Sequence, residues 1–167
     1  MDAVAPARHR LVTWHDPADL RRRARGLTGL DVLHRLASGQ LPPPPVAELV
    51  GFRPTFVSPG LVVFAYEPRE EHYNPLGTVH GGYGATLLDS AMGCAVHSTL
   101  DPGDIYTTLE FKINFMRALT HDTGLVRGIG TVISATRTTA VAEGRIEDGE
   151  GRLYAFATTT CVIRRSS

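Results

Sequence analysis

The segment from Gly81 to Leu100 limits the fold more than any other part of this 167-residue chain. It contains no proline, Pro102-Gly103 ends it, and between residues 85 and 96 only Asp89 interrupts a run of apolar, small and hydroxyl side chains. A helix without a polar face is buried on all sides. We therefore predict one long helix enclosed by the rest of the chain, with small residues that let sheet backbone or a second helix approach closely.

Patterns typical of β-strands lie on both sides of this helix. A short apolar run at residues 61–66 precedes it, and an alternating segment follows, with one face formed by Leu109, Phe111, Ile113 and Phe115. Alternation of this kind indicates a strand with one buried face. Three more runs rich in Val, Ile and Thr follow, joined by tight turns, at residues 125–133, 139–147 and 153–163. We predict an α+β protein in which an antiparallel sheet of five to six strands wraps one long central helix.

A short helical lead-in precedes these elements. Asp16 before Pro17 is an N-cap followed by a first-turn proline, and Thr28 with Asp31 three residues later resembles a capping box. The prolines at residues 42–45 are expected to run extended. We divide the chain into a helical N-terminal extension, residues 1–40, and a main domain, residues 41–167. Four arginines of the first helix are interpreted as a solvated face rather than a phosphate site: Arg21, Arg22, Arg23 and Arg25.

Charge and cysteine content exclude several classes of protein. Seventeen Lys and Arg residues balance seventeen Asp and Glu residues, which argues against a nucleic-acid partner or an anionic membrane. No apolar stretch approaches the roughly 18 residues of a membrane helix, and residues 1–8 lack the features of a signal peptide. Cys94 and Cys161 have neither a pairing nor a zinc-binding spacing and are predicted to be free thiols. These observations favour a soluble protein of the cytoplasm.

Asp89 is the only charged residue between Gly81 and Val96. Burying an unpaired carboxylate costs several kcal/mol. Either this carboxylate is paired with backbone amides or an arginine, or it is an active-site group that acts as a base or nucleophile. Thr-Val-His-Gly-Gly at residues 78–82 begins the same helix, where free amides and the helix dipole stabilise an oxyanion. The combination favours the active-site interpretation.

The stretch Asn-Pro-Leu-Gly-Thr-Val-His-Gly-Gly at residues 74–82, followed by Asp89 nine positions after the histidine, resembles a known family. It is similar to the hotdog-fold acyl-CoA thioesterases of the phenylacetate-pathway (PaaI-like) type, within the 4-hydroxybenzoyl-CoA thioesterase superfamily. The resemblance extends over residues 39–163 and includes the proline-rich leader at 39–45 and the segment 136–143. It implies that residues 41–167 form a hotdog domain that hydrolyses an acyl-CoA thioester to a carboxylic acid and free coenzyme A.

The resemblance also implies roles for residues around the helix. Asp89 corresponds to the family's carboxylate, which attacks the thioester as base or nucleophile. The backbone amide of Gly81 corresponds to the oxyanion donor, with His80 as its positioning residue. Asn74 corresponds to a side-chain amide that orients the water or the carbonyl.

Strand and turn residues complete the implied site. Thr108 corresponds to a hydroxyl that some members place in the second strand, with Thr107 as the alternative if the register slips by one. Coenzyme A is expected to contact Gly82, Arg137 and Thr138. The planar guanidinium of Arg137 suits the diphosphate, whereas an exposed turn arginine without a ligand is the alternative interpretation.

Other chemistries have no matching motif in the sequence. The seven histidines lack metal-ligand spacing, and neither Gly-x-Ser-x-Gly nor a complete phosphate-binding glycine loop is present. We therefore expect no metal and no cofactor. The main alternative is a non-catalytic acyl-CoA or acyl-carrier binding module on the same fold, which would gain nothing from a desolvated Asp89. Hydration of enoyl thioesters would need a different Asp/His pair.

The spacing of Gly81 and Asp89 bears on the oligomeric state. They are eight positions apart, which is ~12 Å along a helix at ~1.5 Å per residue. A thioester carbonyl must lie within ~3 Å of both its attacking group and its oxyanion donor, so one helix cannot supply both. Two antiparallel helices related by a two-fold axis can. We expect a homo-oligomer with active sites shared between protomers, and the resemblance implies a dimer that pairs again into a tetramer.

Overall fold

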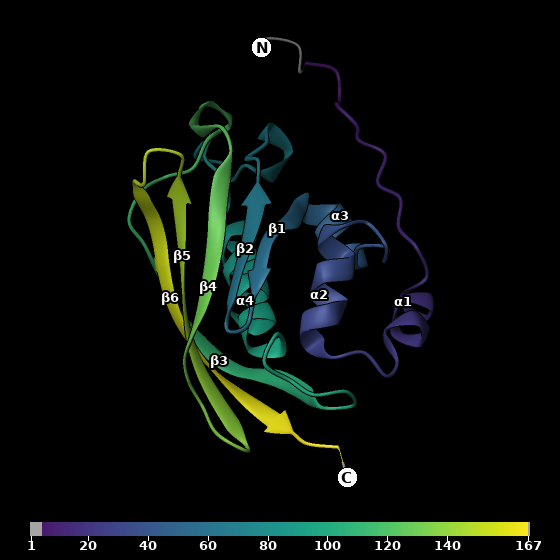
Figure 1. Cartoon of the computed structure of the whole chain (residues 1–167). Helices are drawn as coiled ribbons and strands as arrows, with labels where there is room; N and C mark the ends of the chain where they lie inside the picture. The colour runs from purple at the N-terminus through teal and green to yellow at the C-terminus, as the bar shows by residue number, and fades with distance from the viewer. Residues whose placement is uncertain (1–4, 167) are drawn as a thin grey trace.

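The computed structural model describes residues 5–166. Residues 1–4, which belong to the predicted N-terminal extension and to the segment inspected for a signal peptide, lie outside the described residues, as does residue 167. Three short helices come first, and one long helix follows the second strand (Figure 1). The helices are α1 (Pro17–Ala24), α2 (Gly29–Ala37), α3 (Pro45–Val50) and α4 (Gly81–His97).

Six strands form one antiparallel sheet in the order β1-β2-β4-β5-β6-β3. They are β1 (Phe52–Ser58), β2 (Leu61–Tyr66), β3 (Ile105–Phe115), β4 (Val126–Ala135), β5 (Thr139–Asp148) and β6 (Leu153–Arg164). The sheet curves around α4, which packs against its concave face (Figure 1). This arrangement confirms the predicted α+β hotdog fold.

Helix α4 lies very close to the strands because the sheet presents glycines to it. A Cβ atom added to Gly130 would lie 2.2 Å from the backbone oxygen of Ala91, and one added to Gly128 would lie 2.6 Å from Leu87. The sheet-facing side chains of α4, such as Leu88 and Met92, are fully buried. The helix is therefore held by backbone-to-backbone packing, which tolerates little added volume.

The other side of α4 is not buried within one chain. Gly82 is exposed, and Ala85, Thr86, Asp89 and Ser90 are half-buried. The prediction that the helix is enclosed on all sides is therefore wrong for the single chain. Only small side chains and one carboxylate occupy the uncovered face.

Two elements near the N-terminus were not predicted. Helix α3 begins at Pro45, which was expected to run extended, because proline is tolerated at the first helical position where its missing N–H has no partner. Strand β1 contains Pro54 and has an irregular register beside it, which is tolerated because β1 is an edge strand. Strand β3 forms the opposite edge, and Leu109 and Phe115 on its predicted buried face are more than half exposed.

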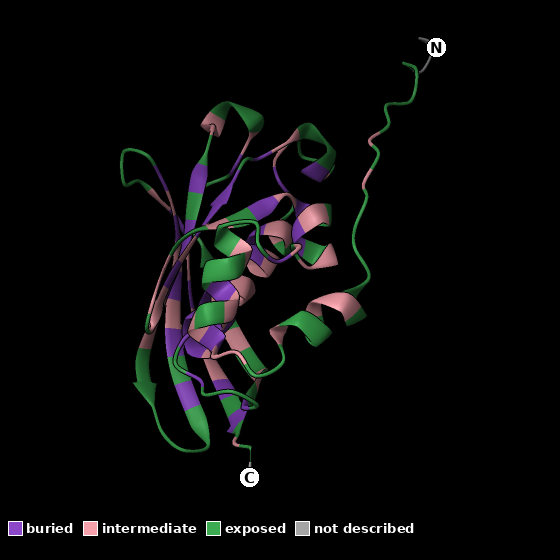
Figure 2. Ribbon diagram, turned by 45° about the vertical axis from the view of Figure 1, so that its right-hand side comes forward, coloured by how far each residue is buried: buried purple, intermediate pink, exposed green. Residues whose placement is uncertain are grey.

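The predicted N-caps are present in the lead-in. The side chain of Asp16 accepts from the amide of Ala18, and that of Thr28 accepts from the amide of Asp31. Helix α2 contributes Leu33 to the core, whereas α1 has no buried residue (Figure 2). The division of the chain at residue 40 stays a prediction. Within residues 5–166, no helix is long and apolar enough to cross a membrane.

Candidate active site

Asp89 lies in the middle of α4 on its half-buried side. Its Oδ1 accepts a hydrogen bond from the hydroxyl of Thr108 in β3 at 3.0 Å. No arginine or backbone amide pairs with the carboxylate among residues 5–166. The purely structural interpretation, a carboxylate neutralised by such a partner, therefore has no support in the geometry.

The register of β3 decides which threonine reaches Asp89. Thr108 is half-buried and lies opposite Cys161 of β6, whereas Thr107 is exposed. The β3–β6 register shifts between Thr108 and Glu110, so a bulge follows the residue that contacts the carboxylate. The structure places Thr108, and not Thr107, beside Asp89.

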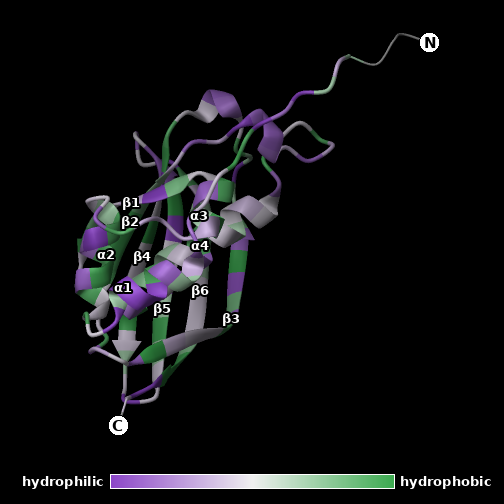
Figure 3. Cartoon of the chain, turned by 90° about the vertical axis from the view of Figure 1, so that its right-hand side faces the viewer, coloured by the Kyte–Doolittle hydropathy of each residue, from purple (hydrophilic) through white to green (hydrophobic). Residues whose placement is uncertain are grey.

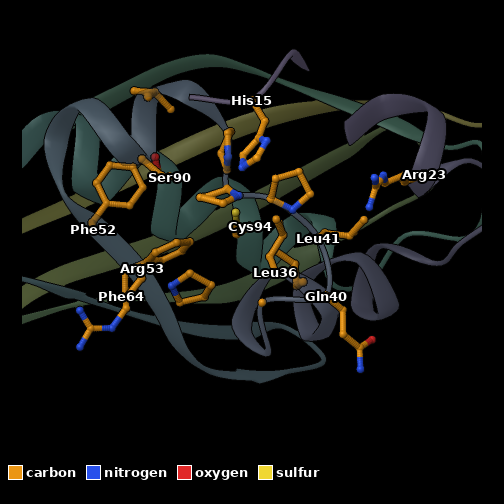
Figure 4. Close-up of a pocket in the computed structure, with 18 of the residues that line it drawn as sticks. His15, Arg23, Leu36, Gln40, Leu41, Phe52, Arg53, Phe64, Ser90 and Cys94 are labelled. Atoms are coloured by element: carbon orange, nitrogen blue, oxygen red, sulfur yellow. The ribbon is translucent and has the colours of Figure 1, made fainter. Parts of the chain in front are cut away.

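A cavity of about 570 Å³ opens beside this pair. Asp89 and Thr108 line it together with Ser90, Cys94 and Tyr106. Its walls are mostly apolar and come from α2, the proline segment 42–44, β1 and β2 (Figure 4). They include Leu33, Leu36, Leu41, Phe52 and Phe64. The volume lies in the ~300–1,000 Å³ range of small-molecule sites.

Cys94 also lines this cavity, and the chemistry of its thiol does not favour attack. Burial raises the pKa of the Cys94 thiol to about 12, and the nearby charge of Asp89 adds to this increase. A thiol with such a pKa holds its proton at neutral pH and is a poor nucleophile. Cys94 and Cys161 are both free, as predicted. Cys94 is therefore a weaker candidate for the reactive group than Asp89.

His80, Gly81 and Gly82 lie together at the start of α4. His80 is the N-cap, and its Nδ1 accepts from the amide of Gly82 at 3.0 Å. The amide of Gly81 has no acceptor among the described residues. A free amide at a helix N-terminus is suited to stabilising negative charge on an oxygen.

The loop before α4 holds this helix start through two residues, one of which the sequence did not single out. Asn74 uses its side chain within the loop: Oδ1 accepts from the amide of Leu76 at 2.9 Å, and Nδ2 donates to Thr78 at 3.1 Å. His72 is buried, its carbonyl accepts from the amide of His80 at 2.8 Å, and its ring stacks between two tyrosines. Only the tertiary contacts distinguish His72 from an ordinary turn histidine.

Gly81 and Asp89 face different cavities. His80 and Gly81 line a second cavity of about 340 Å³, whose other walls include Phe115 and Arg117. Asp89 and Thr108 do not line it, and Gly81 does not line the first cavity. One chain therefore does not bring the proposed attacking group and the oxyanion donor to the same space.

Arg137 and Thr138 lie in the β4–β5 hairpin, away from both cavities. Both are exposed, and the guanidinium of Arg137 has no partner among the described residues. The carbonyl of Thr138 accepts from Ile163 at 2.7 Å, which fixes the hairpin against β6. Residues 5–166 contain no cluster of three or more His, Cys, Asp or Glu side chains arranged to hold a metal ion.

Comparison with known proteins agrees with this architecture. A family model described as the thioesterase superfamily matches residues 76–155. The 1,4-dihydroxy-2-naphthoyl-CoA hydrolase of Listeria monocytogenes is 25% identical over 118 residues, which cover 71% of this chain and 94% of that protein.

Two solved structures show the same fold. The phenylacetic acid degradation-related protein of Ralstonia eutropha JMP134 is 30% identical, with a TM-score of 0.71, and the match covers 78% of this chain and 98% of that one. A mutant of the phenylacetic acid degradation protein PaaI of Thermus thermophilus is 29% identical, with a TM-score of 0.65, covering 74% of this chain and 100% of that one.

A long helix wrapped by an antiparallel sheet, together with these structural neighbours, defines a hotdog-fold protein. The chain belongs to the thioesterase superfamily and is a thioester hydrolase of the PaaI-like type.

Proposed function

We propose that this protein hydrolyses acyl-CoA thioesters with Asp89 as the catalytic carboxylate. The observation that carries the proposal is the Asp89 carboxylate, which lines a largely apolar cavity and has the Thr108 hydroxyl as its one hydrogen-bond partner among residues 5–166. The cavity accepts the acyl group, and the carboxylate lies where the thioester carbonyl would enter. The hydrolase relative named for a coenzyme A ester supports this substrate class.

The chemistry follows from the groups at this position. Asp89 either removes a proton from a water that adds to the carbonyl carbon, or attacks that carbon itself to form an anhydride that water then cleaves. The carbonyl oxygen becomes an oxyanion, which the Gly81 amide stabilises. The carbon–sulfur bond then breaks, and the thiolate of coenzyme A leaves and takes up a proton. The reaction needs no metal or cofactor, and we assign it to the cytoplasm because both cysteines are free thiols.

The active site is shared between protomers in this proposal. Gly81 and Asp89 lie ~12 Å apart along α4 and line separate cavities. The uncovered face of α4 carries small side chains, including Gly82 and Ala85, which allow a second helix to pack closely. An antiparallel α4 from a partner brings its Gly81 beside Asp89. Two such dimers then form the tetramer that the family resemblance implies.

The coenzyme A part of the substrate contacts the start of α4 and the β4–β5 hairpin in this proposal. Gly82 lets the thioester approach the helix start without a side chain in the way. Arg137 presents a free guanidinium to the diphosphate, and Thr138 lies beside it in the hairpin. His80 and Asn74 hold the helix start and its loop in place.

Replacing Asp89 tests the proposal. Asp89→Asn keeps the shape of the side chain but removes the base, so we expect thiol release from a panel of acyl-CoA esters to fall at least ~100-fold. Thermal stability should hold or rise, because a desolvated charge is lost. Asp122→Asn, an exposed carboxylate outside both cavities, is the control and should leave the rate unchanged. Turnover like that of the wild type in Asp89→Asn contradicts the catalytic role. Tight acyl-CoA binding without turnover by the wild type would identify a binding module instead.

A further inference from the structure

The N-terminal extension contributes to the cavity that Asp89 lines. His15, Asp19 and Arg23 line it, and in the view of Figure 4 Arg23 lies on the opposite side of the cavity from Ser90, the chain neighbour of Asp89. Figure 4 shows the His15 and Arg23 side chains directed toward the cavity, whereas those of Gln40 and Arg53 point away from it. These residues belong to a segment that we call the strap, residues 11–27, which includes α1 and lies before the region that the family model matches.

The strap is fixed at its two ends and free in between. At its start, the Arg10 guanidinium donates to the carbonyl of Leu49 at 2.6 Å and pairs with Glu71 at 2.8 Å. At its end, the amide of Gly29 donates to Leu100 at 3.0 Å, so tightly that a Cβ on Gly29 would lie 1.8 Å from the backbone of His97.

Between these anchors, strap residues form hydrogen bonds and ion pairs only with one another, within the described part of the chain. Helix α1 has no buried residue and a hydrophilic surface (Figure 3). Its position over the cavity is therefore not explained by core packing, and a bound acyl group is the contact that would hold it there.

The strap adds further charged groups to a cavity whose walls are mostly apolar. Asp19 pairs with both Arg22 and Arg23, the latter through Nε at 2.8 Å, so two guanidinium groups share one carboxylate. The Arg23 side chain is 57% exposed, and its terminal nitrogens have no acceptor among the described residues, so only water solvates them until an acyl group displaces it. An acyl group ending in a methyl group would displace water from these N–H donors without offering them an acceptor, and this loss of hydrogen bonds weakens binding. An acyl group ending in a carboxylate gives them a charge-assisted hydrogen bond.

We propose that the strap is the wall that determines acyl-group specificity, and that Arg23 selects acyl groups carrying a carboxylate at the end remote from the thioester. The apolar walls contact the hydrocarbon part, and the strap contacts the distal carboxylate. This inference rests on the proposed acyl-CoA hydrolysis.

The test compares octanoyl-CoA with its ω-carboxyl counterpart on the full-length protein. We expect the wild type to prefer the ω-carboxyl ester in kcat/KM. Arg23→Ala should lose about tenfold on that ester, the effect of one charge-assisted hydrogen bond, and less than about twofold on octanoyl-CoA. Asp19→Asn should increase the preference for the ω-carboxyl ester, because it removes the carboxylate that pairs with the Arg23 guanidinium. Arg21→Ala is the matched control, an exposed arginine of the same helix that does not line the cavity.

Each other outcome has a defined meaning. Arg23→Ala could instead lower kcat/KM equally on both coenzyme A esters and leave it unchanged on the matching N-acetylcysteamine thioesters. This result would show that the strap contacts the nucleotide of coenzyme A, and the inference would be wrong. Unchanged selectivity in both Arg23→Ala and Asp19→Asn also contradicts it, while hydrolysis that still depends on Asp89 leaves the proposed function intact. Failure of the functional proposal itself is recognised by a different result: the Asp89→Asn variant would still hydrolyse both esters.

Discussion

Thr108 is the one side chain that hydrogen-bonds to Asp89 among the described residues, at 3.0 Å. Its hydroxyl fixes the carboxylate on one side and leaves the other oxygen free to face the cavity. Thr107, the neighbouring threonine, is exposed. A hydroxyl at this position therefore orients the carboxylate, and its methyl group only fills space.

We predict that Thr108→Val lowers kcat for acyl-CoA hydrolysis by about tenfold, because it removes one hydrogen bond to a charged group and keeps the volume. Thr108→Ser retains the hydroxyl and should stay within about threefold of the wild type. Thr107→Val is the control and should have no effect. Steady-state kinetics on purified variants measures all three, and equal rates for Thr108→Val and Thr108→Ser would show that the hydroxyl is not needed.

Arg137 is the second residue with a prediction of its own. If its guanidinium binds the diphosphate, Arg137→Ala should raise KM for acyl-CoA about tenfold and leave kcat nearly unchanged. KM for a truncated thioester without the nucleotide should not change. An equal rise in KM on both substrates would show that Arg137 does not act by binding the nucleotide. Measurement of kcat and KM on the two substrates distinguishes these results.

Among the elements, α4 and the central strands approach each other closely through their backbones. Gly130 in β4 faces the backbone of Ala91, where an added Cβ would lie 2.2 Å from an oxygen that cannot move without moving the helix. The same close approach sets the distance between the sheet and the helix that carries Asp89. Packing at this position therefore supports both stability and the geometry of the site.

We predict that Gly130→Ala lowers the melting temperature by at least about 5 °C, because overpacking against backbone costs about 2 kcal/mol or more. Gly149→Ala is the matched control: it lies in the β5–β6 turn with open space around it and should shift the melting temperature by less than about 2 °C. Calorimetry on both variants gives the comparison. Similar melting temperatures would mean that the helix can shift away from the sheet at little cost.

At the scale of the whole molecule, Gly81 and Asp89 line separate cavities, and the proposed mechanism therefore needs a second chain. Gly81→Pro removes the free amide at the first helical position, and the extended conformation of His80 (ψ 132°) is compatible with a following proline. Gly81→Ala adds a Cβ but keeps the amide and serves as the control, which should stay active.

We predict that mixing Asp89→Asn chains with Gly81→Pro chains, each nearly inactive alone, restores activity when subunits exchange. Random mixing makes about half of the dimers mixed, each with one intact site of two, so about a quarter of the wild-type activity should return. Thiol release measures the recovery, and mass analysis of labelled chains verifies exchange. No recovery despite proven exchange would falsify the shared site.

Stability should also depend on pH through two histidines, the buried His72 and the half-buried His97. Burial lowers the pKa of His72 and of His97 below the ordinary value of ~6.5. Below about pH 6.5 the unfolded chain therefore binds protons that the folded chain does not. The free energy of unfolding is highest above about pH 7 and decreases as the pH falls toward these lowered pKa values. We predict a falling melting temperature between about pH 7 and pH 5.

His97→Phe should flatten part of this dependence, whereas the exposed His9→Ala should keep the wild-type slope. Differential scanning calorimetry at a series of pH values gives the slopes. Parallel curves for His97→Phe and the wild type would exclude His97 as a contributor.

Much of the fold follows from local patterns in the sequence. The long helix, the three C-terminal strands and the N-caps at Asp16 and Thr28 were predicted, because periodicity, turn residues and capping act over a few neighbouring positions. Asp89 was identified for a similar reason, since a single charge in an apolar helix is visible without coordinates.

The tertiary structure decided what depends on contacts between distant segments. It decided that Pro45 begins a helix and Pro54 lies in a strand, because a helix start and a sheet edge do not need the missing amides. It selected Thr108 over Thr107 through the β3–β6 register, placed Gly81 and Asp89 in separate cavities, and brought Arg23 to the cavity that Asp89 lines. Residue types and their spacing specify which groups are available, but only the packing of remote elements decides which of them share a space.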